Sequence, residues 1–334
     1  MSEVKIRAID SGDDGLRLDR WFKKHYPSLS HGQLQKLLRT GQIRVDGKRV
    51  KANLKVCEQQ SVRVPPIAVH ASDKSPGGQH KNVSRKQSVN PETIKDLKSR
   101  ILFRNAEILI LDKPAGLAVQ GGSRTPVHLD GMLDELRFDA DERPRLVHRL
   151  DKDTSGVLVL GRTAKATRWL TAQFKHRETR KLYWALVAGM PKLSNGQIRL
   201  PLAKLPGKGG EKMTASETGK YAETNYRILD HAGRNTAWLA MEPMTGRTHQ
   251  LRAHAAIALE TPIIGDGKYG GATAFVDGIP EKSLQLHARA LLIPMPNGGP
   301  IVVEAPLPRH MEENFQFFGF HPTPENSDFM ENLG

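Results

Sequence analysis

The stretch RLVHRLDKDTSGVLVLGRT, residues 145–163, carries two apolar runs on either side of a cluster of charged side chains. The runs lie at residues 146–147 and 157–160 and are rich in β-branched residues, which predicts two strands. Residues 154–156, Thr-Ser-Gly, predict the turn between them. Asp151 follows the first strand and precedes this turn. A carboxylate in that place is held rigidly and can face a cleft.

The wider region, residues 96–320, repeats the same strand pattern. Helical periodicity is confined to residues 166–177 and 249–259. Because strands run together and helices are scattered, we predict an α+β fold with a largely antiparallel mixed β-sheet and flanking helices. The predicted strands are residues 107–116, 147–150, 156–163, 181–189, 221–230, 235–243, 284–294 and 300–307.

A separate small domain is predicted at residues 10–65. Leu18, Phe22 and Tyr26 recur at helical spacing, and a second helix begins with a Ser30–Gln33 capping box and ends at Gly41. The segment QIRVDGKRV then alternates around Asp-Gly, a strong hairpin signal. We therefore expect a helix–helix–hairpin unit.

Positive charge is concentrated in this small domain. The chain has 334 residues and a formal net charge of +14, and residues 1–64 hold 14 Lys and Arg against 7 Asp and Glu. Such a cluster on a compact basic unit favours contact with nucleic acid over an ordinary solvated face. A membrane surface is the alternative, but no apolar run approaches the roughly 20 residues of a spanning helix. The residues expected to contact RNA are Lys36, Arg39, Arg44, Lys48 and Arg49.

The remaining segments have no apolar periodicity. Residues 66–95 are rich in Ser, Pro, Gly and Lys and predict a flexible linker, and residues 321–334 predict an acidic tail. The N-terminus shows no secretory signal, and Cys57 is the single cysteine, which excludes a disulfide framework within one chain. We expect a cytoplasmic protein.

Several catalytic classes leave no trace in the sequence. There is no G-x-S-x-G elbow and no phosphate-binding P-loop, and His249 and His254 miss the spacing of an HExxH zinc site. Asp151 beside Arg149 would be ionised and could act as a nucleophile or base at a sugar anomeric carbon. From spacing alone, a solvated turn aspartate is an equally good interpretation.

A resemblance separates these two interpretations. The segments ILDKPAGLAVQGG, HRLDKDTSGVLVLGRT, KLYWALVAG, GRTHQLRAH and LQLHARALL resemble, in order over roughly 200 residues, the motifs of the RluA family of pseudouridine synthases. The basic N-terminal unit resembles an S4 RNA-binding domain, although CEQQSVRV replaces the Gly-Asp-x-Val stretch that usually closes it.

The resemblance implies a reaction and a set of roles. The family breaks the N1–C1′ bond of a uridine flipped out of RNA, turns the uracil and rejoins it through C5, with no metal or cofactor. By resemblance Asp151 is the catalytic carboxylate, whose attack at C1′, addition at C6 or deprotonation of C2′ stays open. Tyr183 would stack on the uracil, Arg149 would contact the RNA, and Arg247 would pair with Asp151 or a phosphate.

The resemblance also implies a partner. An S4 domain ahead of this catalytic domain is typical of synthases that act on 23S ribosomal RNA or the assembling large subunit, and we expect a monomer. Two alternatives remain, which are a synthase for transfer RNA or other RNA, and a non-enzymatic RNA-binding ribosome-assembly protein with an inactive synthase domain.

Overall fold

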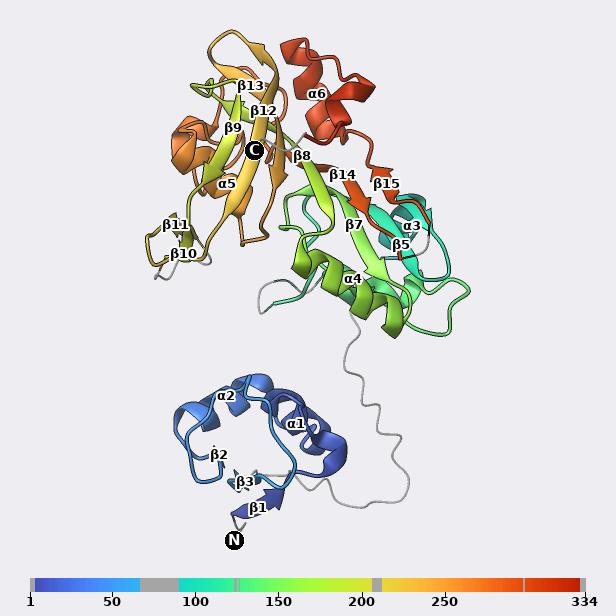
Figure 1. Ribbon diagram of the computed structural model, residues 1–334, viewed down its shortest axis with the longest axis vertical. Coiled ribbons are helices and arrows are strands. Elements are labelled where there is room, and N and C mark those ends of the chain that lie inside the picture. Colours follow the sequence, from blue (N-terminus) through green and yellow to red (C-terminus); the bar gives the residue numbers. More distant parts are fainter. Residues whose placement is uncertain are drawn as a thin grey trace. The chain divides into compact units, whose positions relative to one another are not determined.

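The computed structural model describes residues 4–66, 90–122, 125, 127–205, 212–296 and 298–330. The chain divides into two compact units, residues 1–82 and 83–334, which are considered separately below (Figure 1). Most of the predicted linker, residues 67–89, lies outside the described residues, and a helix that begins at Pro91 falls within its predicted carboxyl end.

The N-terminal unit packs two helices on a three-stranded antiparallel sheet of order β1-β3-β2. Its elements are β1 (Lys5–Ala8), α1 (Leu18–His25), α2 (His31–Arg39), β2 (Arg44–Val45) and β3 (Ser61–Val64). Trp21 and Phe22 lie in the core against Val62 and Val64 of β3. The predicted capping box of α2 is present, because Gln33 N donates to Ser30 Oγ and Ser30 N donates to Gln33 Oε1.

The predicted hairpin is present only at its turn. Asp46 and Gly47 both have positive φ, 48° and 74°, as a two-residue hairpin turn requires. The residues after the turn do not form the second strand, and β2 pairs with β3 instead. The reason is burial, since Lys48 and the residue after it are exposed while β3 buries every second side chain.

The C-terminal unit is built on one ten-stranded sheet, which confirms the predicted fold class. The path of hydrogen-bonded strands is β4-β5-β7-β14-β8-β13-β12-β9, with β15 on β14 and β6 on β7. Every pair is antiparallel except β14 with β7. The strands are β4 (Ile101–Arg104), β5 (Ile108–Lys113), β6 (Arg145–Leu146), β7 (Ser155–Gly161), β8 (Arg180–Ala188), β9 (Asn195–Arg199), β12 (Glu223–Ala232), β13 (Thr236–Pro243), β14 (Leu286–Ile293) and β15 (Ile301–Glu304). A separate ribbon pairs β10 (Leu202–Lys204) with β11 (Met213–Ala215).

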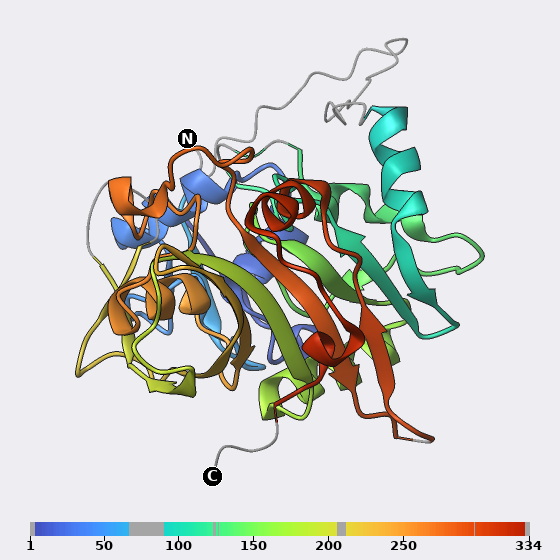
Figure 2. The ribbon, with the colours of Figure 1, turned by 90° about the horizontal axis from the view of Figure 1, so that it is seen from above.

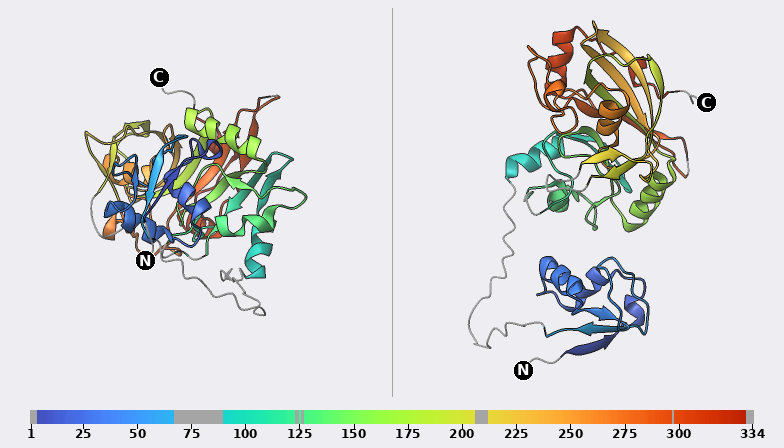
Figure 3. Two further views of the ribbon diagram at one scale, coloured as in Figure 1. Left: turned by 90° about the horizontal axis from the view of Figure 1, so that it is seen from below. Right: turned by 90° about the vertical axis from the view of Figure 1, so that its left-hand side faces the viewer.

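Helices cover both faces of this sheet. On the β5–β7 half, α4 (Ala164–His176) packs on one face, and α3 (Pro91–Ser99) and the 3-10 helix η2 (Leu129–Leu136) pack on the other. On the β8–β13 half, α5 (Gln250–Ala253) continues as a π-helical turn to Ala258 and covers one face. The opposite face is covered by α6 (Arg309–Phe318), drawn in red in Figure 3.

The stretch at residues 145–163 differs from its prediction in two places. The predicted strand at residues 147–150 is wrong, because β6 ends at Leu146. The His148 imidazole Nε2 accepts a hydrogen bond from Val159 N at 2.9 Å and so takes the place of a strand carbonyl beside β7. The turn predicted at residues 154–156 is also wrong, since it lies at Lys152–Asp153 and β7 already begins at Ser155.

The two halves of the sheet are joined by β14, which comes late in the sequence. Figure 2 shows this strand, in orange-red, between the green and the yellow-green strands. Its backbone passes directly against Gly156, where an added Cβ would lie 2.2 Å from Ala288 O. Gly156 also has a φ of 106°, which favours glycine. Glycine at this position therefore allows the two halves to meet.

Residues of the predicted tail pack on the same unit. Met330 is buried, and its backbone is held by Arg180 and Glu242 of β8 and β13, with Met330 N 3.1 Å from Glu242 Oε2. Residues 331–334 lie outside the described part. Among the described helices, none is both long and apolar enough to cross a membrane.

Candidate active site

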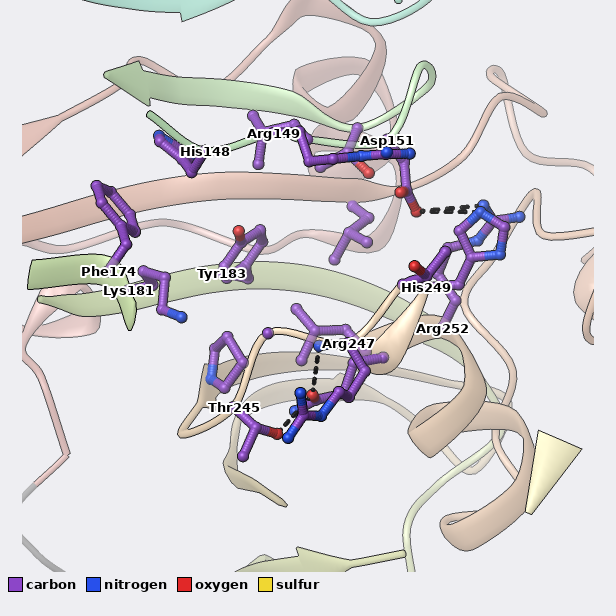
Figure 4. Close-up of a pocket in the computed structure, with 18 of the residues that line it drawn as sticks. His148, Arg149, Asp151, Phe174, Lys181, Tyr183, Thr245, Arg247, His249 and Arg252 are labelled. Atoms are coloured by element: carbon purple, nitrogen blue, oxygen red, sulfur yellow. Dashed lines mark hydrogen bonds and ion pairs between the residues drawn. The ribbon is translucent and has the colours of Figure 1, made fainter. Parts of the chain in front are cut away.

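Two adjoining cavities meet at Asp151. The first has a cavity volume of about 340 Å³ and the second about 820 Å³, and both are lined by Arg149, Asp151, His249 and Arg252. The first cavity extends over β8 to Tyr183 and Lys181 (Figure 4). Its size is that of a small-ligand site. Asp151 is the one acidic side chain among the described residues that line it.

Arg252 of α5 connects Asp151 to a second carboxylate. Its Nε and Nη2 donate to the two oxygens of buried Asp266, each at 2.7 Å, and its Nη1 lies 3.4 Å from Asp151 Oδ2. Burial works against the charged guanidinium, yet the bonds to Asp266 and Asp151 raise the pKa of Arg252. The bidentate pair fixes the plane of the guanidinium, so that one N–H is directed at Asp151.

Arg252 thus makes the contact with Asp151 that the resemblance suggested for Arg247. Arg247 lines the cavity, but its Nε donates to Tyr221 O at 2.8 Å, and it makes no contact with Asp151 in the described structure. Arg149 is exposed and lines both cavities. Helical spacing offered a signal, because Arg252 follows His249 by three residues and both side chains reach Asp151.

His249 takes a backbone conformation that side chains rarely adopt. Its φ is 50°, and its ring Nδ1 lies 3.0 Å from Tyr269 Oη while Nε2 lies 3.8 Å from Asp151 Oδ2. Burial lowers the pKa of His249. Such left-handed residues concentrate at functional sites, where surrounding contacts maintain the strain.

Tyr183 forms the floor of the first cavity. It lies on β8, partly buried, between the cores of the two halves of the sheet. Burial, and then the negative charge of Asp151, raise the pKa of its phenol above the ordinary value. The hydroxyl therefore stays protonated, and the ring presents a flat apolar surface to the cavity.

Buried Lys113 supports the turn that carries Asp151. Its Nζ donates to three backbone carbonyls, those of Pro114 at 2.8 Å, Leu117 at 2.9 Å and Lys152 at 3.0 Å. Burial lowers its pKa to about 8, while Asp153 and Asp151 act in the opposite direction. The amine thereby ties the end of β5 to the residue that follows Asp151.

The five basic residues of the N-terminal unit that are expected to contact RNA are of two kinds. Arg44 is tied into its own turn, with Nε donating to Gly41 O at 3.2 Å and Nη1 to Gly47 O at 3.1 Å. The Arg49 guanidinium lies against Gly41. The other three are exposed, namely Lys36, Arg39 and Lys48.

Comparison with known proteins covers the segment of the chain that holds this cavity. Residues 107–257, which include Asp151, Tyr183 and Arg252, match the family model described as RNA pseudouridylate synthase. An uncharacterized RNA pseudouridine synthase of Synechocystis is 31% identical over 93% of this chain and 91% of its own length. The chain belongs to the RNA pseudouridine synthases. These enzymes are isomerases that act on RNA.

Two further similarities agree with this assignment. Ribosomal large subunit pseudouridine synthase C of Vibrio cholerae is 32% identical over 94% of this chain and 98% of its own length. The structure of human RNA pseudouridylate synthase domain containing 4 superposes with a TM-score of 0.58 at 25% identity, covering 68% of this chain and 96% of that one. The resemblance to the RluA family seen in the sequence is confirmed.

Proposed function

We propose that this synthase converts uridines of 23S ribosomal RNA to pseudouridine in the cytoplasm, acting as a monomer, with Asp151 as the reacting carboxylate. The observation that carries the proposal is the position of Asp151, where the two cavities meet and where Arg252 and Tyr183 flank it. The name of the Vibrio cholerae relative supports the large-subunit substrate.

The reaction balances within the nucleotide. The C1′–N1 bond breaks, the uracil turns, and a C1′–C5 bond forms, after which C5 loses its proton and N1 holds one. Attack at C1′, addition at C6 and deprotonation of C2′ all use a free oxygen of the Asp151 carboxylate. The uridine must leave the base stack to reach that oxygen, at an unstacking cost of a few kcal/mol.

Each neighbour of Asp151 has a place in this scheme. The Tyr183 ring offers a stacking surface to the flipped uracil, and stacking of this kind tolerates rotation of the base. Arg252 supplies positive charge beside the carboxylate and fixes its orientation. Exposed Arg149 stands at the mouth of both cavities, where it can contact the RNA backbone or fill the vacated stack.

The test is tritium release from C5 of uridine-labelled 23S transcript. Asp151→Asn keeps the shape of the side chain and removes its charge, and we expect turnover to fall more than about 10³-fold with RNA affinity retained. Asp141→Asn, at an exposed position outside both cavities, is the matched control. Residual turnover of Asp151→Asn within tenfold of the wild type would contradict the assignment.

The RNA substrate is tested separately by mapping pseudouridines in RNA from cells lacking the gene. Loss of sites in 23S ribosomal RNA supports the proposal. Loss of pseudouridines from transfer RNA alone would show that the enzyme is a transfer RNA synthase. If the pseudouridine map does not change and the wild-type protein releases no tritium, the remaining interpretation is a non-enzymatic ribosome-assembly protein.

A further inference from the structure

Lys181 is the feature of the first cavity that the proposed chemistry does not use. On β8 the side chains alternate, so that Lys181 and Tyr183 face the cavity while Arg180 faces the other way and pairs with Glu242. Lys181 therefore belongs to the cavity floor. In Figure 4, Tyr183 lies between Lys181 and Asp151.

The Lys181 amine has no partner among the described residues. No hydrogen bond or ion pair engages it there, whereas fully buried Lys113 of the same unit donates to three carbonyls. Lys181 is partly buried, and a lysine withdrawn from solvent is usually paired. Burial, and then the nearby charge of Arg177, lower the pKa of Lys181 to about 8.

A second cation lies close to this amine. Arg177 ends α4 with a φ of 64°, is exposed, and lines the same cavity. Its guanidinium also has no bonding partner in the part of the chain that the structure describes. Glu242, the carboxylate that acts on Lys181, already accepts hydrogen bonds from Nε and Nη2 of Arg180. The two cations thus repel one another with no anion between them.

The adjacent wall does not supply the missing negative charge. His148 stacks on Phe174 with ring centroids 4.3 Å apart and an interplanar angle of 15°. Its Nε2 accepts from Val159 N, and burial lowers its pKa to about 3, so the imidazole is neutral. A ligand that enters the cavity can supply the compensating negative charge.

We propose that Lys181, with Arg177, binds a phosphodiester of the RNA next to the uridine held at Asp151. This inference rests on the proposed function, because it takes the occupant of the cavity to be a nucleotide. A phosphate oxygen forms strong charge-assisted bonds with both cations and relieves their repulsion. A uracil carbonyl is neutral and does not.

The experiment uses a stem–loop RNA that carries one convertible uridine and a single methylphosphonate at each successive linkage around it. Methylphosphonate removes the negative charge of one linkage. With the wild-type enzyme we expect one linkage at which the change raises KM about tenfold, in line with the loss of a bond to a charged group. In Lys181→Met the same change should raise KM clearly less, because only Arg177 then remains to bind the charged linkage.

Two other variants complete the design. Lys181→Arg keeps the charge and should restore most of the linkage effect. Lys192→Met removes a lysine that is exposed and paired with Glu260 at 3.0 Å outside the cavities, and it should behave as the wild type does. On unmodified RNA, Lys181→Met should raise KM about tenfold with little change in kcat, because a phosphate contact is made equally in ground and transition states.

Thermal stability provides a readout that a structural role would move in the opposite direction. Removing an unpaired, partly buried charge should leave the Tm of Lys181→Met at or above that of the wild type. A clear fall in Tm would contradict the unpaired state and overturn the proposal. The proposal is also overturned if the methylphosphonate cost in Lys181→Met equals that in the wild type at every linkage. It is overturned too if Lys181→Met lowers kcat alone, because that result would place Lys181 on the uracil.

Failure of the proposed function would look different. A wild-type enzyme that forms no pseudouridine in the stem–loop or in 23S transcript contradicts the function. Filter binding of the same methylphosphonate series still decides whether Lys181 contacts a phosphate.

Discussion

Arg252 divides one guanidinium between two carboxylates of very different exposure. The Asp266 side chain is fully buried, while that of Asp151 is 21% exposed. The buried pair holds the cation in place, and the carboxylate of Asp151 stays open to the two cavities. A lysine has no planar fork with which to make both contacts.

The first prediction concerns this division. Arg252→Lys should lower kcat about 10²-fold, because a misplaced Asp151 loses its alignment with the reacting atom. KM should change little, since the RNA contacts remain. Tritium release under saturating RNA measures kcat. Arg247→Lys is the comparison, and an equal loss of kcat in the two variants would contradict a special role for Arg252.

Sequence patterns located Asp151 and Tyr183 but not their connection. Arg252 was not singled out because both arginines lie in one short segment, and only the path of α5 decides which one reaches Asp151. A phosphate contact of Arg247 stays a prediction. Lys113 and Lys181 gave no pattern, because an amine surrounded by carbonyls and one without a partner look alike in a sequence.

At the scale of elements, Gly156 limits how β7 and β14 can pair. Gly156→Ala would set a Cβ against the Ala288 backbone and strain a φ of 106°. We expect a loss of roughly 2–4 kcal/mol in unfolding free energy, combining overpacking with backbone strain. Urea unfolding measures this. Gly299→Ala, where a Cβ meets nothing within 4 Å, should change stability by less than about 0.5 kcal/mol.

Strand β5 ends in a buried carboxylate whose titration gives a second prediction at this scale. Burial raises the pKa of Asp112 to about 6 from 3.8, although Arg100 Nη1 lies 3.5 Å away. The folded state therefore binds more protons than the unfolded state between these values, and unfolding free energy falls as pH rises from about 4 to 6.

Asp112→Asn should remove that fall. The stability of the variant relative to the wild type should rise through the same pH window and stay level above it. Thermal unfolding of both proteins at intervals from pH 4 to pH 7.5 measures the difference, in which the other titrating groups cancel. Parallel curves would show that Asp112 has an ordinary pKa.

Local signals predicted elements well where the cause is local. The α2 capping box and the Asp46–Gly47 turn each depend on residues only a few positions apart, and both are present. The strand expected at residues 147–150 failed because His148 bonds to Val159, eleven residues away. The pairing of β2 with β3 was missed because it joins residues that are distant in sequence, such as Val45 and Val62.

For the whole molecule, charge is the property that a solution measurement reports most directly. Lys36, Arg39 and Lys48 are exposed and have no bonded side-chain partner among the described residues. Replacing all three with alanine should flatten the slope of log affinity against log salt by about 2, at about 0.7 per phosphate contact on single-stranded RNA. Turnover at saturating RNA should not change.

The control removes the same charge from the same unit. Lys5, Lys23 and Lys55 are also exposed, and they lie outside the basic residues named for RNA contact. The triple alanine variant at these positions should keep the wild-type slope. An equal decrease of the salt slope in both triple variants would mean that net charge governs RNA affinity, and not the surface formed by Lys36, Arg39 and Lys48.

The late position of β14 in the chain has a consequence for biosynthesis. Asp151 belongs to the half of the sheet made first, and Tyr183 and Arg252 belong to the half made second. Until residues 286–293 leave the ribosome, β7 and β8 each lack the neighbour that separates them, and both present open edges. Nascent chains fold from the N-terminus, and pairings distant in sequence form slowly. An enzyme whose proposed substrate is ribosomal RNA thus acquires its site only after the ribosome has released β14.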